Sequence, residues 1–295
     1  MKREIFDRFR RIAYEHAGIH LKEGKESLVD ARVAKRLRAL GLSTPEQYLD
    51  VLERDESGDE LVQFLDAIST NFTSFFREQE HFELLGAQIK RWLDDGQRKF
   101  RIWSAASSTG EEPYSIAITV AEATAGVPVD ARILATDIST RVLAHASRGV
   151  YELSRLGPLS PARRGRFFVH VDGPKGAEPY YQVIPEIRRL VLFKRLNLSA
   201  RAMPMHGPLD VVFVRNVMMY FDTAVRQSLI SEVERLLRVD GLLLIGHAES
   251  LSGLKTSLTQ VKPSVFRKAA PSHRAACGTP TTTAQGRRPA TAGVS

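Results

Sequence analysis

The residues best suited to chemistry lie between positions 101 and 118, where two acidic side chains follow a run of small residues. A short apolar segment, Ile102-Trp103, passes into small residues from Ala105 to Gly110, and then come Glu111, Glu112 and an apolar-periodic segment. This order predicts a strand, a tight loop and a helix start, which together let a backbone approach a nucleotide-like ligand closely. The Gly-x-Gly-x-x-Gly pattern of dinucleotide sites is absent, and two carboxylates would repel a pyrophosphate. They suit a cationic or hydroxyl-rich ligand, and S-adenosylmethionine is both.

Each of these acids also has a simpler interpretation. Glu111 and Glu112 stand in a first helical turn, where acids complement the helix dipole, and we expect one of them to do only that. Asp137 ends the next predicted strand, where nucleotide-binding α/β folds place an acid that accepts hydrogen bonds from ribose hydroxyls. The alternative is that Asp137 caps the helix beginning near Ser139. The small-residue loop upstream favours the ligand interpretation.

Asn216 follows an apolar strand, 210–215, and so falls at the carboxyl edge where open α/β sheets bind ligands. It could instead be an ordinary turn residue. The nearby Tyr220 and Phe221 favour a functional role for this loop.

The segment Asn71–Glu78 lies at the junction of two predicted units. Asn71 and Thr73 could be helix caps, and the two phenylalanines that follow could be core residues. Arg77 beside them is harder to dismiss, because a buried guanidinium needs an anionic partner. Either an internal acid or a ligand carboxylate would serve.

Composition sets the class of protein. The 295 residues are enough for two domains, and 43% hydrophobic and 26% charged residues are typical of a soluble globular protein. No signal peptide or long apolar run is present, and the single cysteine, Cys277, excludes a disulfide framework or a cysteine-based zinc site. We expect a cytoplasmic protein without a metal. The net charge of +8 is spread among acids, which favours an acidic protein partner over nucleic acid.

The pattern of elements predicts two domains and a tail. Residues 1–75 read as an all-helical domain, with a helix from Glu26 to Leu40 that stops at Gly41 and another that starts in a capping box from Ser43 to Glu46. Residues 76–268 alternate strands and helices, which predicts a parallel sheet, with an antiparallel excursion at about 166–194. Residues 269–295 are expected to be disordered. The expected sheet strands are 100–104, 132–136, 191–194, 209–214 and 242–246.

Five segments closely resemble the CheR-type chemotaxis receptor methyltransferases, and the resemblance runs in order from about residue 5 to residue 268. The Ser-Thr-Gly-Glu-Glu-Pro-Tyr-Ser motif is highly specific. The resemblance implies a Rossmann-like class I methyltransferase sheet with a small antiparallel β-subdomain, preceded by an all-helical N-terminal domain. The five segments are residues 70–78, 103–115, 135–138, 213–222 and 241–250.

The same resemblance implies a ligand set for S-adenosylmethionine. Asp137 and Glu112 would engage its nucleoside and methionyl parts, while Asn197-Leu198 would lie by the adenine. Arg77 and Tyr220 would flank the methyl group as the catalytic residues. One departure, Phe72, falls at a position whose side chain is not expected to be a ligand. The full implied binding set is Asn71, Thr73, Arg77, Glu112, Asp137, Asn197, Leu198, Arg215 and Asn216.

The implied reaction is methyl transfer to glutamate side chains of chemotaxis receptors, giving glutamyl methyl esters, by an enzyme that we expect to be a monomer. A basic helix with Arg32, Lys35, Arg36 and Arg38 would dock the acidic cytoplasmic receptor helices, although it could be a plain solvated face. A long turn at 172–179 favours an enzyme that needs no receptor peptide tether. Two alternatives remain: a methyltransferase for another substrate such as nucleic acid, and a regulatory module without turnover.

Overall fold

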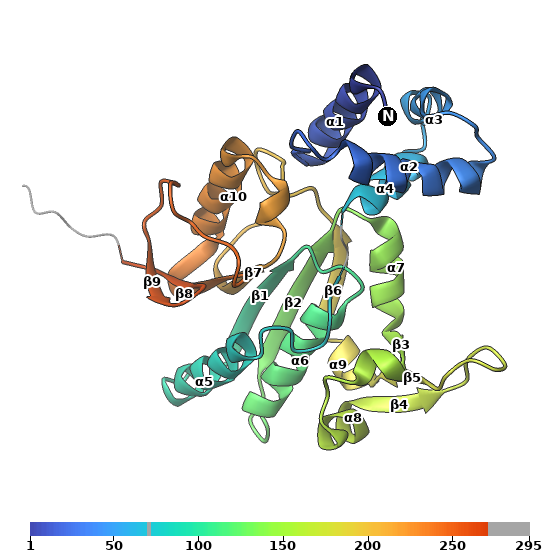
Figure 1. The fold of residues 1–295 in the computed structure, drawn as a ribbon. Helices are drawn as coiled ribbons and strands as arrows, with labels where there is room; N and C mark the ends of the chain where they lie inside the picture. The colour runs from blue at the N-terminus through green and yellow to red at the C-terminus, as the bar shows by residue number, and fades with distance from the viewer. Residues whose placement is uncertain (70–71, 271–295) are drawn as a thin grey trace, which may run out of the picture.

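The computed structural model describes residues 1–69 and 72–270 and confirms the expected α/β fold with a helical domain at the N-terminus (Figure 1). Within these two ranges, no helix is long and apolar enough to cross a membrane. The predicted tail, apart from Ala269 and Ala270, lies outside the described residues.

Four amphipathic helices form the N-terminal domain. Their apolar faces meet in a core centred on Phe9, Tyr48 and Phe64, whose rings pack at centroid distances of 5.3 to 6.2 Å. The second helix begins and ends as predicted, with Gly41 in the left-handed conformation after it. The helices are α1 (Arg3–Ala17), α2 (Glu26–Leu40), α3 (Pro45–Glu53) and α4 (Asp59–Ile68).

The capping box of α3 was predicted one residue too early. Thr44 is the cap, and its side chain accepts from the backbone N–H of Gln47 while the Gln47 side chain accepts from the backbone N–H of Thr44. Pro45 occupies the first helical position, where its lack of an N–H is harmless. The residue directly before it, Thr44 and not Ser43, is therefore the cap.

The second domain is built on a seven-stranded sheet of order β6-β2-β1-β7-β8-β10-β9. The five predicted strands all lie in it and run parallel. The antiparallel pair β9–β10 at one edge was not predicted. The strands are β1 (Lys99–Ala105), β2 (Asp130–Asp137), β6 (Val191–Arg195), β7 (Leu209–Val214), β8 (Leu237–Ile245), β9 (Leu258–Lys262) and β10 (Val265–Lys268).

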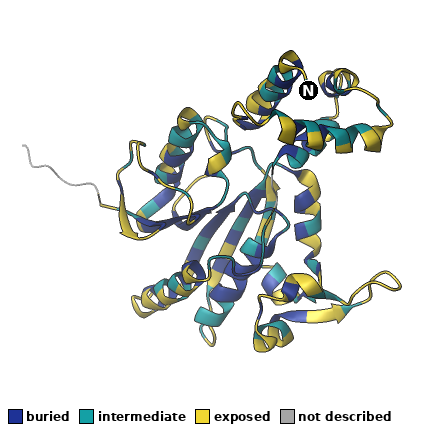
Figure 2. Cartoon of the chain, in the orientation of Figure 1, coloured by how far each residue is buried: buried dark blue, intermediate teal, exposed yellow. Residues whose placement is uncertain are grey.

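Helices cover both faces of this sheet, and its central strand β7 is buried at every position (Figure 2). In β7, Val211 and Phe213 belong to the apolar cluster that contains α5 and α6, whereas Val212 and Val214 belong to the cluster that contains α10. The helices are α5 (Glu80–Asp94), α6 (Glu111–Ala123), α7 (Thr140–Arg148) and α10 (Thr223–Leu236).

The antiparallel excursion exists but its predicted limits were wrong. It is a three-stranded sheet of order β3-β5-β4, made of β3 (Val150–Glu152), β4 (Phe168–Val171) and β5 (Tyr180–Val183). Residues 191–194, which the prediction placed partly in it, pair with β2 in the main sheet instead. Short helices surround it: η1 (Leu153–Leu156), α8 (Pro161–Phe167) and α9 (Pro185–Arg188), with η2 (Met218–Tyr220) following β7.

Candidate functional site

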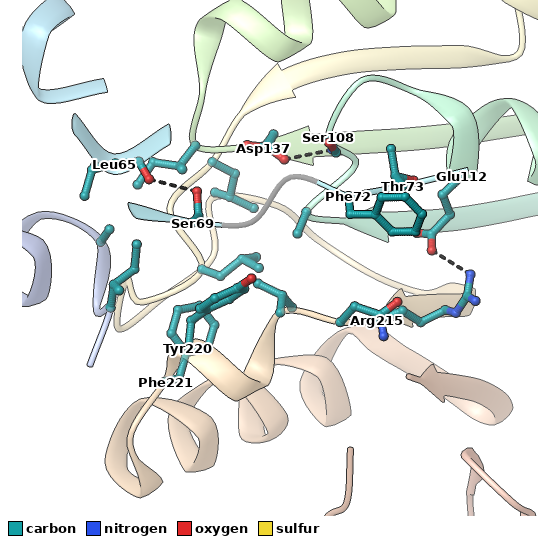
Figure 3. Close-up of a pocket in the computed structure, with 18 of the residues that line it drawn as sticks. Leu65, Ser69, Phe72, Thr73, Ser108, Glu112, Asp137, Arg215, Tyr220 and Phe221 are labelled. Carbon is teal, nitrogen blue, oxygen red and sulfur yellow. Dashed lines mark hydrogen bonds and ion pairs between the residues drawn. The ribbon is translucent and has the colours of Figure 1, made fainter. Parts of the chain in front are cut away.

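A pocket lies at the carboxyl ends of β1, β2, β6 and β7, closed on one side by the helical domain (Figure 3). Parallel strands present their loops at this edge, which is why residues far apart in the chain meet there. The pocket is lined by polar and apolar side chains in similar measure. Among its described lining residues are Ile19, Leu65, Phe72, Thr73, Arg77, Ser108, Glu112, Asp137, Ile138, Asn197, Leu198, Arg215, Asn216, Tyr220 and Phe221.

The loop between β1 and α6 is as tight as the sequence predicts. Ala106 and Ser108 adopt left-handed backbone conformations with φ of 62° and 48°, and Gly110 has φ of 101°. A side chain at Gly110 would meet the Tyr151 hydroxyl at 2.7 Å, so only glycine fits there. The loop therefore packs closely and delivers Ser108 and Glu112 to the pocket.

Of the two neighbouring glutamates, Glu112 lines the pocket and Glu111 does not. Glu111 is buried and accepts a hydrogen bond of 2.6 Å from the Thr109 hydroxyl. Glu112 accepts from the Ser104 hydroxyl at 2.7 Å and pairs with Arg215 at 2.8 Å. Burial raises the pKa of Glu112, and the charge of Arg215 offsets part of that rise.

Asp137 stands at the end of β2 with its carboxylate at the pocket (Figure 3). It accepts backbone N–H bonds from Ser108 at 2.9 Å and from Ser139 at 3.0 Å. The helix cap of α7 is the Ser139 hydroxyl, which accepts from Val142. Asp137 thus supports the turn without being the cap, and its carboxylate has acceptor capacity left for a hydroxyl-bearing ligand. Burial raises its pKa.

The buried guanidinium of this site is Arg215, not Arg77. The Arg215 side chain is 1% exposed and pairs with Glu78 at 3.0 Å and Glu112 at 2.8 Å. It also donates to the backbone carbonyl of Arg77. These contacts link β7, the α6 start and the junction segment, because one planar guanidinium can serve several acceptors at once.

Arg77 itself lines the pocket and is only partly buried. It donates to the carbonyl of Phe72 at 2.8 Å, and its guanidinium lies 5.6 Å from the centre of the Phe72 ring. Within residues 1–69 and 72–270 it forms no ion pair. Its charge is therefore available for an anionic ligand group.

Phe72 was not expected to be a ligand position, yet its ring lines the pocket (Figure 3). Asn71, in the expected ligand set, lies outside the described residues. No pattern in the sequence distinguishes a ring that lines a pocket from one in the core, which is why Phe72 was missed.

Asn197 and Leu198, which follow β6, reach the pocket as expected of a strand-end loop. The Asn197 amide donates to the carbonyl of His16 at 2.8 Å and accepts from Ser199. This contact connects the loop to the end of α1. Leu198 is buried and offers an apolar surface.

The loop after β7 brings Asn216 and Tyr220 to the pocket. Asn216 has a left-handed backbone with φ of 58°. The backbone carbonyl of Tyr220 accepts from the N–H of His20 at 2.7 Å, and Ile19 forms a bridge with Phe221. The helical domain is thus attached directly to this loop.

Sequence reasoning expected no metal, and the structure brings Glu78, His81 and His247 together with ligand atoms within 4.8 Å of one another. Burial lowers the pKa of His81 to about 4, so its ring is neutral. The Glu78 carboxylate already pairs with Arg215 and accepts the backbone N–H of His247 at 3.3 Å. A dication beside that buried guanidinium would be repelled. Glu78 thus serves as the counter-charge of Arg215.

The charges around the pocket favour a ligand with net positive charge. Glu78, Glu112 and Asp137 supply three carboxylates against the two guanidinium groups of Arg77 and Arg215. S-adenosylmethionine carries a sulfonium, an ammonium and one carboxylate, so its charge complements this surplus. Its ribose would meet Asp137, its carboxylate would meet Arg77, and Ile138 and Leu198 offer apolar contact for a base. The residues present fit this donor.

Comparison with known proteins follows the same division of the chain. The family model described as CheR methyltransferase, SAM binding domain, matches residues 71–266, and the one described as CheR methyltransferase, all-alpha domain, matches residues 4–69. The chain is 41% identical to a chemotaxis protein methyltransferase of Salmonella typhimurium over 84% of each chain. It is 40% identical to one of Escherichia coli, over 86% of this chain and 87% of the relative. Chemotaxis protein methyltransferase 2 of Pseudomonas aeruginosa is also 40% identical, over 90% and 94%.

Proposed function

Since this chain belongs to the CheR methyltransferase family, we propose that it methylates glutamate side chains of chemotaxis receptors, with S-adenosylmethionine as methyl donor. The observation that carries the proposal is the pocket in which Asp137, Glu112 and Arg215 meet at the carboxyl edge of the sheet. The products are a glutamyl methyl ester and S-adenosylhomocysteine. The enzyme acts as a monomer in the cytoplasm.

The donor supplies a methyl carbon activated by an adjacent sulfonium. A carboxylate oxygen of the receptor glutamate forms a bond to that carbon, and the carbon–sulfur bond breaks with its electron pair remaining on sulfur. A glutamate is already ionised at neutral pH, so no general base has to remove a proton. The protein's contribution is alignment of the two reactants and exclusion of water.

Donor binding is assigned to groups on both sides of the pocket. Asp137 accepts hydrogen bonds from the ribose hydroxyls, and the Glu112 carboxylate, held by Arg215, faces the ammonium end. Thr73, Asn197 and Asn216 complete the polar lining. Asn71 remains in the proposed set as the family resemblance implies, with no structural support of its own.

Arg77 and Tyr220 are assigned to the methyl end of the pocket. The Arg77 guanidinium has no acidic partner within residues 1–69 and 72–270, so it can pair with the incoming glutamate carboxylate or hold the donor carboxylate. The Tyr220 ring lines the same pocket from the loop after β7 and would direct its hydroxyl to the reacting oxygen. Both roles position charge where the new bond forms.

The proposal is tested by incubating the protein with donor carrying a labelled methyl group and with membranes that contain chemotaxis receptors. We expect label on the receptors that alkali releases as methanol, because an ester is hydrolysed and an N-methyl group is not. The Asp137→Asn variant should incorporate far less label at low donor concentration. Label on nucleic acid would support another methyltransferase, and donor binding without any transfer would support a regulatory module; either result overturns the proposal.

A further inference from the structure

A carboxylate outside the pocket holds the loop that follows β7. Glu249 lies after β8, and its Oε1 accepts the backbone N–H groups of Val217 at 2.9 Å and Met218 at 2.8 Å. Its Oε2 accepts those of Asn216 at 2.9 Å and Gly246 at 2.7 Å. One side chain therefore binds four backbone donors, three of them consecutive. Glu249 itself does not line the pocket.

The backbone N–H groups of this turn need hydrogen-bond acceptors, and Glu249 supplies them. Asn216 has φ of 58°, a left-handed conformation that places the next N–H groups on one side of the turn, away from any strand partner. Unpaired donors in this partly buried position would cost free energy. An ionised carboxylate satisfies them with charge-assisted bonds, which are stronger than neutral ones.

The space for this contact is shaped by Gly246. A Cβ atom at that position would lie 2.5 Å from Nδ2 of Asn216, 3.0 Å from its backbone nitrogen and 3.0 Å from Oε2 of Glu249. Any larger residue would push the carboxylate or Asn216 aside. The glycine therefore permits the same arrangement that Glu249 stabilises.

We propose that Glu249 is a positioning residue for methyl transfer. It fixes the turn at Asn216 and so sets the positions of Asn216 and Tyr220, which both line the pocket. Figure 3 shows Tyr220 there. The inference rests on the proposed function, which assigns Tyr220 to the end of the pocket where the methyl group is transferred. Asp137 approaches from the end of β2 and Glu112 from the first turn of α6, and neither of them bonds to Glu249. Loss of Glu249 should consequently impair the chemical step more than donor binding.

The test compares Glu249→Gln with Glu234→Gln in the full-length protein. The glutamine keeps the size of the side chain but presents an amide N–H₂ to backbone donors. Glu234 is a matched control, since its carboxylate also accepts backbone N–H groups, of Ser257 at 2.7 Å and Leu258 at 3.3 Å, away from the pocket. Glu234 accepts these bonds through one oxygen, so Glu234→Gln removes the same charge from a carboxylate that holds backbone donors and controls for the loss of that charge.

We expect Glu249→Gln to lower kcat by about 10²-fold at saturating donor, the size of effect that a small misplacement of reacting groups produces, with KM for the donor changed far less. Glu234→Gln should keep the wild-type kcat. Hydrogen exchange in the peptide containing residues 216–218 should accelerate in Glu249→Gln alone. Gly246→Ala, which leaves the carboxylate in place but crowds Asn216, should also lower kcat.

Equal kcat values for the Glu249→Gln and Glu234→Gln enzymes, both folded at the assay temperature, would overturn the inference. A rise in KM for the donor that accounts for the whole loss of activity of the Glu249→Gln enzyme would also overturn it. If the wild-type protein transfers no methyl group, the proposed function fails instead, and the exchange measurement alone then decides whether Glu249 holds the turn.

Discussion

At the scale of single residues, the carboxylates of the pocket differ in how burial and charge act on their pKa values. Burial raises the pKa of Asp137 and of Glu112, although Arg215 offsets part of the change for Glu112. Burial also acts to raise the pKa of Glu78, but the charge and hydrogen bonds of Arg215 outweigh it and leave that pKa lowered. Asp137 and Glu112, which we assign to the donor, therefore take up protons more readily as the pH falls. Glu78, on the other side of Arg215, stays ionised.

This difference predicts a pH dependence of donor binding. A raised carboxylate pKa means that Asp137 takes up its proton at a higher pH than an ordinary aspartate, and the neutral form attracts a cationic donor less. Affinity for S-adenosylmethionine should therefore fall as the pH decreases, and the fall should begin at a higher pH than an ordinary aspartate would give. Titration calorimetry between pH 7.5 and pH 5 checks this.

The control for that titration is Asp137→Asn, which cannot ionise at this position. The variant should bind the donor more weakly at pH 7.5, by about 1–3 kcal/mol, since a hydrogen bond to a charged group is lost. Its affinity should also change less with pH than that of the wild type. Parallel pH profiles of the two proteins would show that Asp137 is not the group that titrates.

Residue-level prediction worked where the signal is local. Asp137 and Glu112 were identified from strand ends and a small-residue loop, and both reach the pocket. Burial was expected of Arg77, yet the buried guanidinium is that of Arg215. Its burial depends on Glu78 and Glu112, which lie far from it in the sequence. Glu249 was missed for a similar reason: its partners are backbone groups, which carry no side-chain pattern.

At the scale of elements, α2 has fewer basic side chains available to a partner than its sequence indicates. Arg36 forms a bidentate ion pair with Glu60 on α4, with N···O distances of 2.9 and 2.6 Å. Glu60 also accepts a hydrogen bond of 2.6 Å from the Tyr48 hydroxyl. The Arg36 side chain holds the helical domain together and is not available for docking. Lys35 and Arg38 remain exposed and, with the half-buried Arg32, form the basic face of α2.

We predict that the basic face of α2 docks the acidic receptor helices. Replacing both Lys35 and Arg38 by glutamate should raise KM for receptors several-fold at low salt, and the difference should shrink as salt screens the charges. KM for the donor should be unchanged, because neither residue lines the pocket. Methylation rates measured against receptor concentration at two ionic strengths check the prediction.

The matched control reverses two exposed lysines on the other domain, Lys90 on α5 and Lys262 on β9. The net change in charge is the same, so an effect of total charge alone would appear in both double variants. If KM for receptors is the same in the two double variants, the basic face of α2 is not the docking surface for the receptor helices.

Prediction of elements succeeded for long periodic segments and failed for short ones. Helix α2 and the five parallel strands were found because each carries a clear apolar pattern. Strand β3 has three residues, and in the two strands of the hairpin β9–β10 only Leu258, Val265 and Phe266 are buried, so neither has such a pattern. Helix α5 was left unassigned between the junction segment and β1.

At the scale of the whole molecule, the pocket belongs to both domains. Ile19 and Leu65 line it from the helical domain, while Asp137 and Arg215 line it from the sheet. The bridge between Ile19 and Phe221 and the bond from His20 to Tyr220 join the domains beside it. We infer that the helical domain closes the donor site as well as presenting a surface to the receptor.

The most direct test is a crystal structure of the protein with S-adenosylhomocysteine, the product that remains after methyl transfer. We predict that the ligand fills the pocket between the domains, with its ribose hydroxyls on the Asp137 carboxylate and its sulfur near Tyr220 and Arg77. A ligand bound elsewhere, or one whose ribose makes no contact with Asp137, would contradict it.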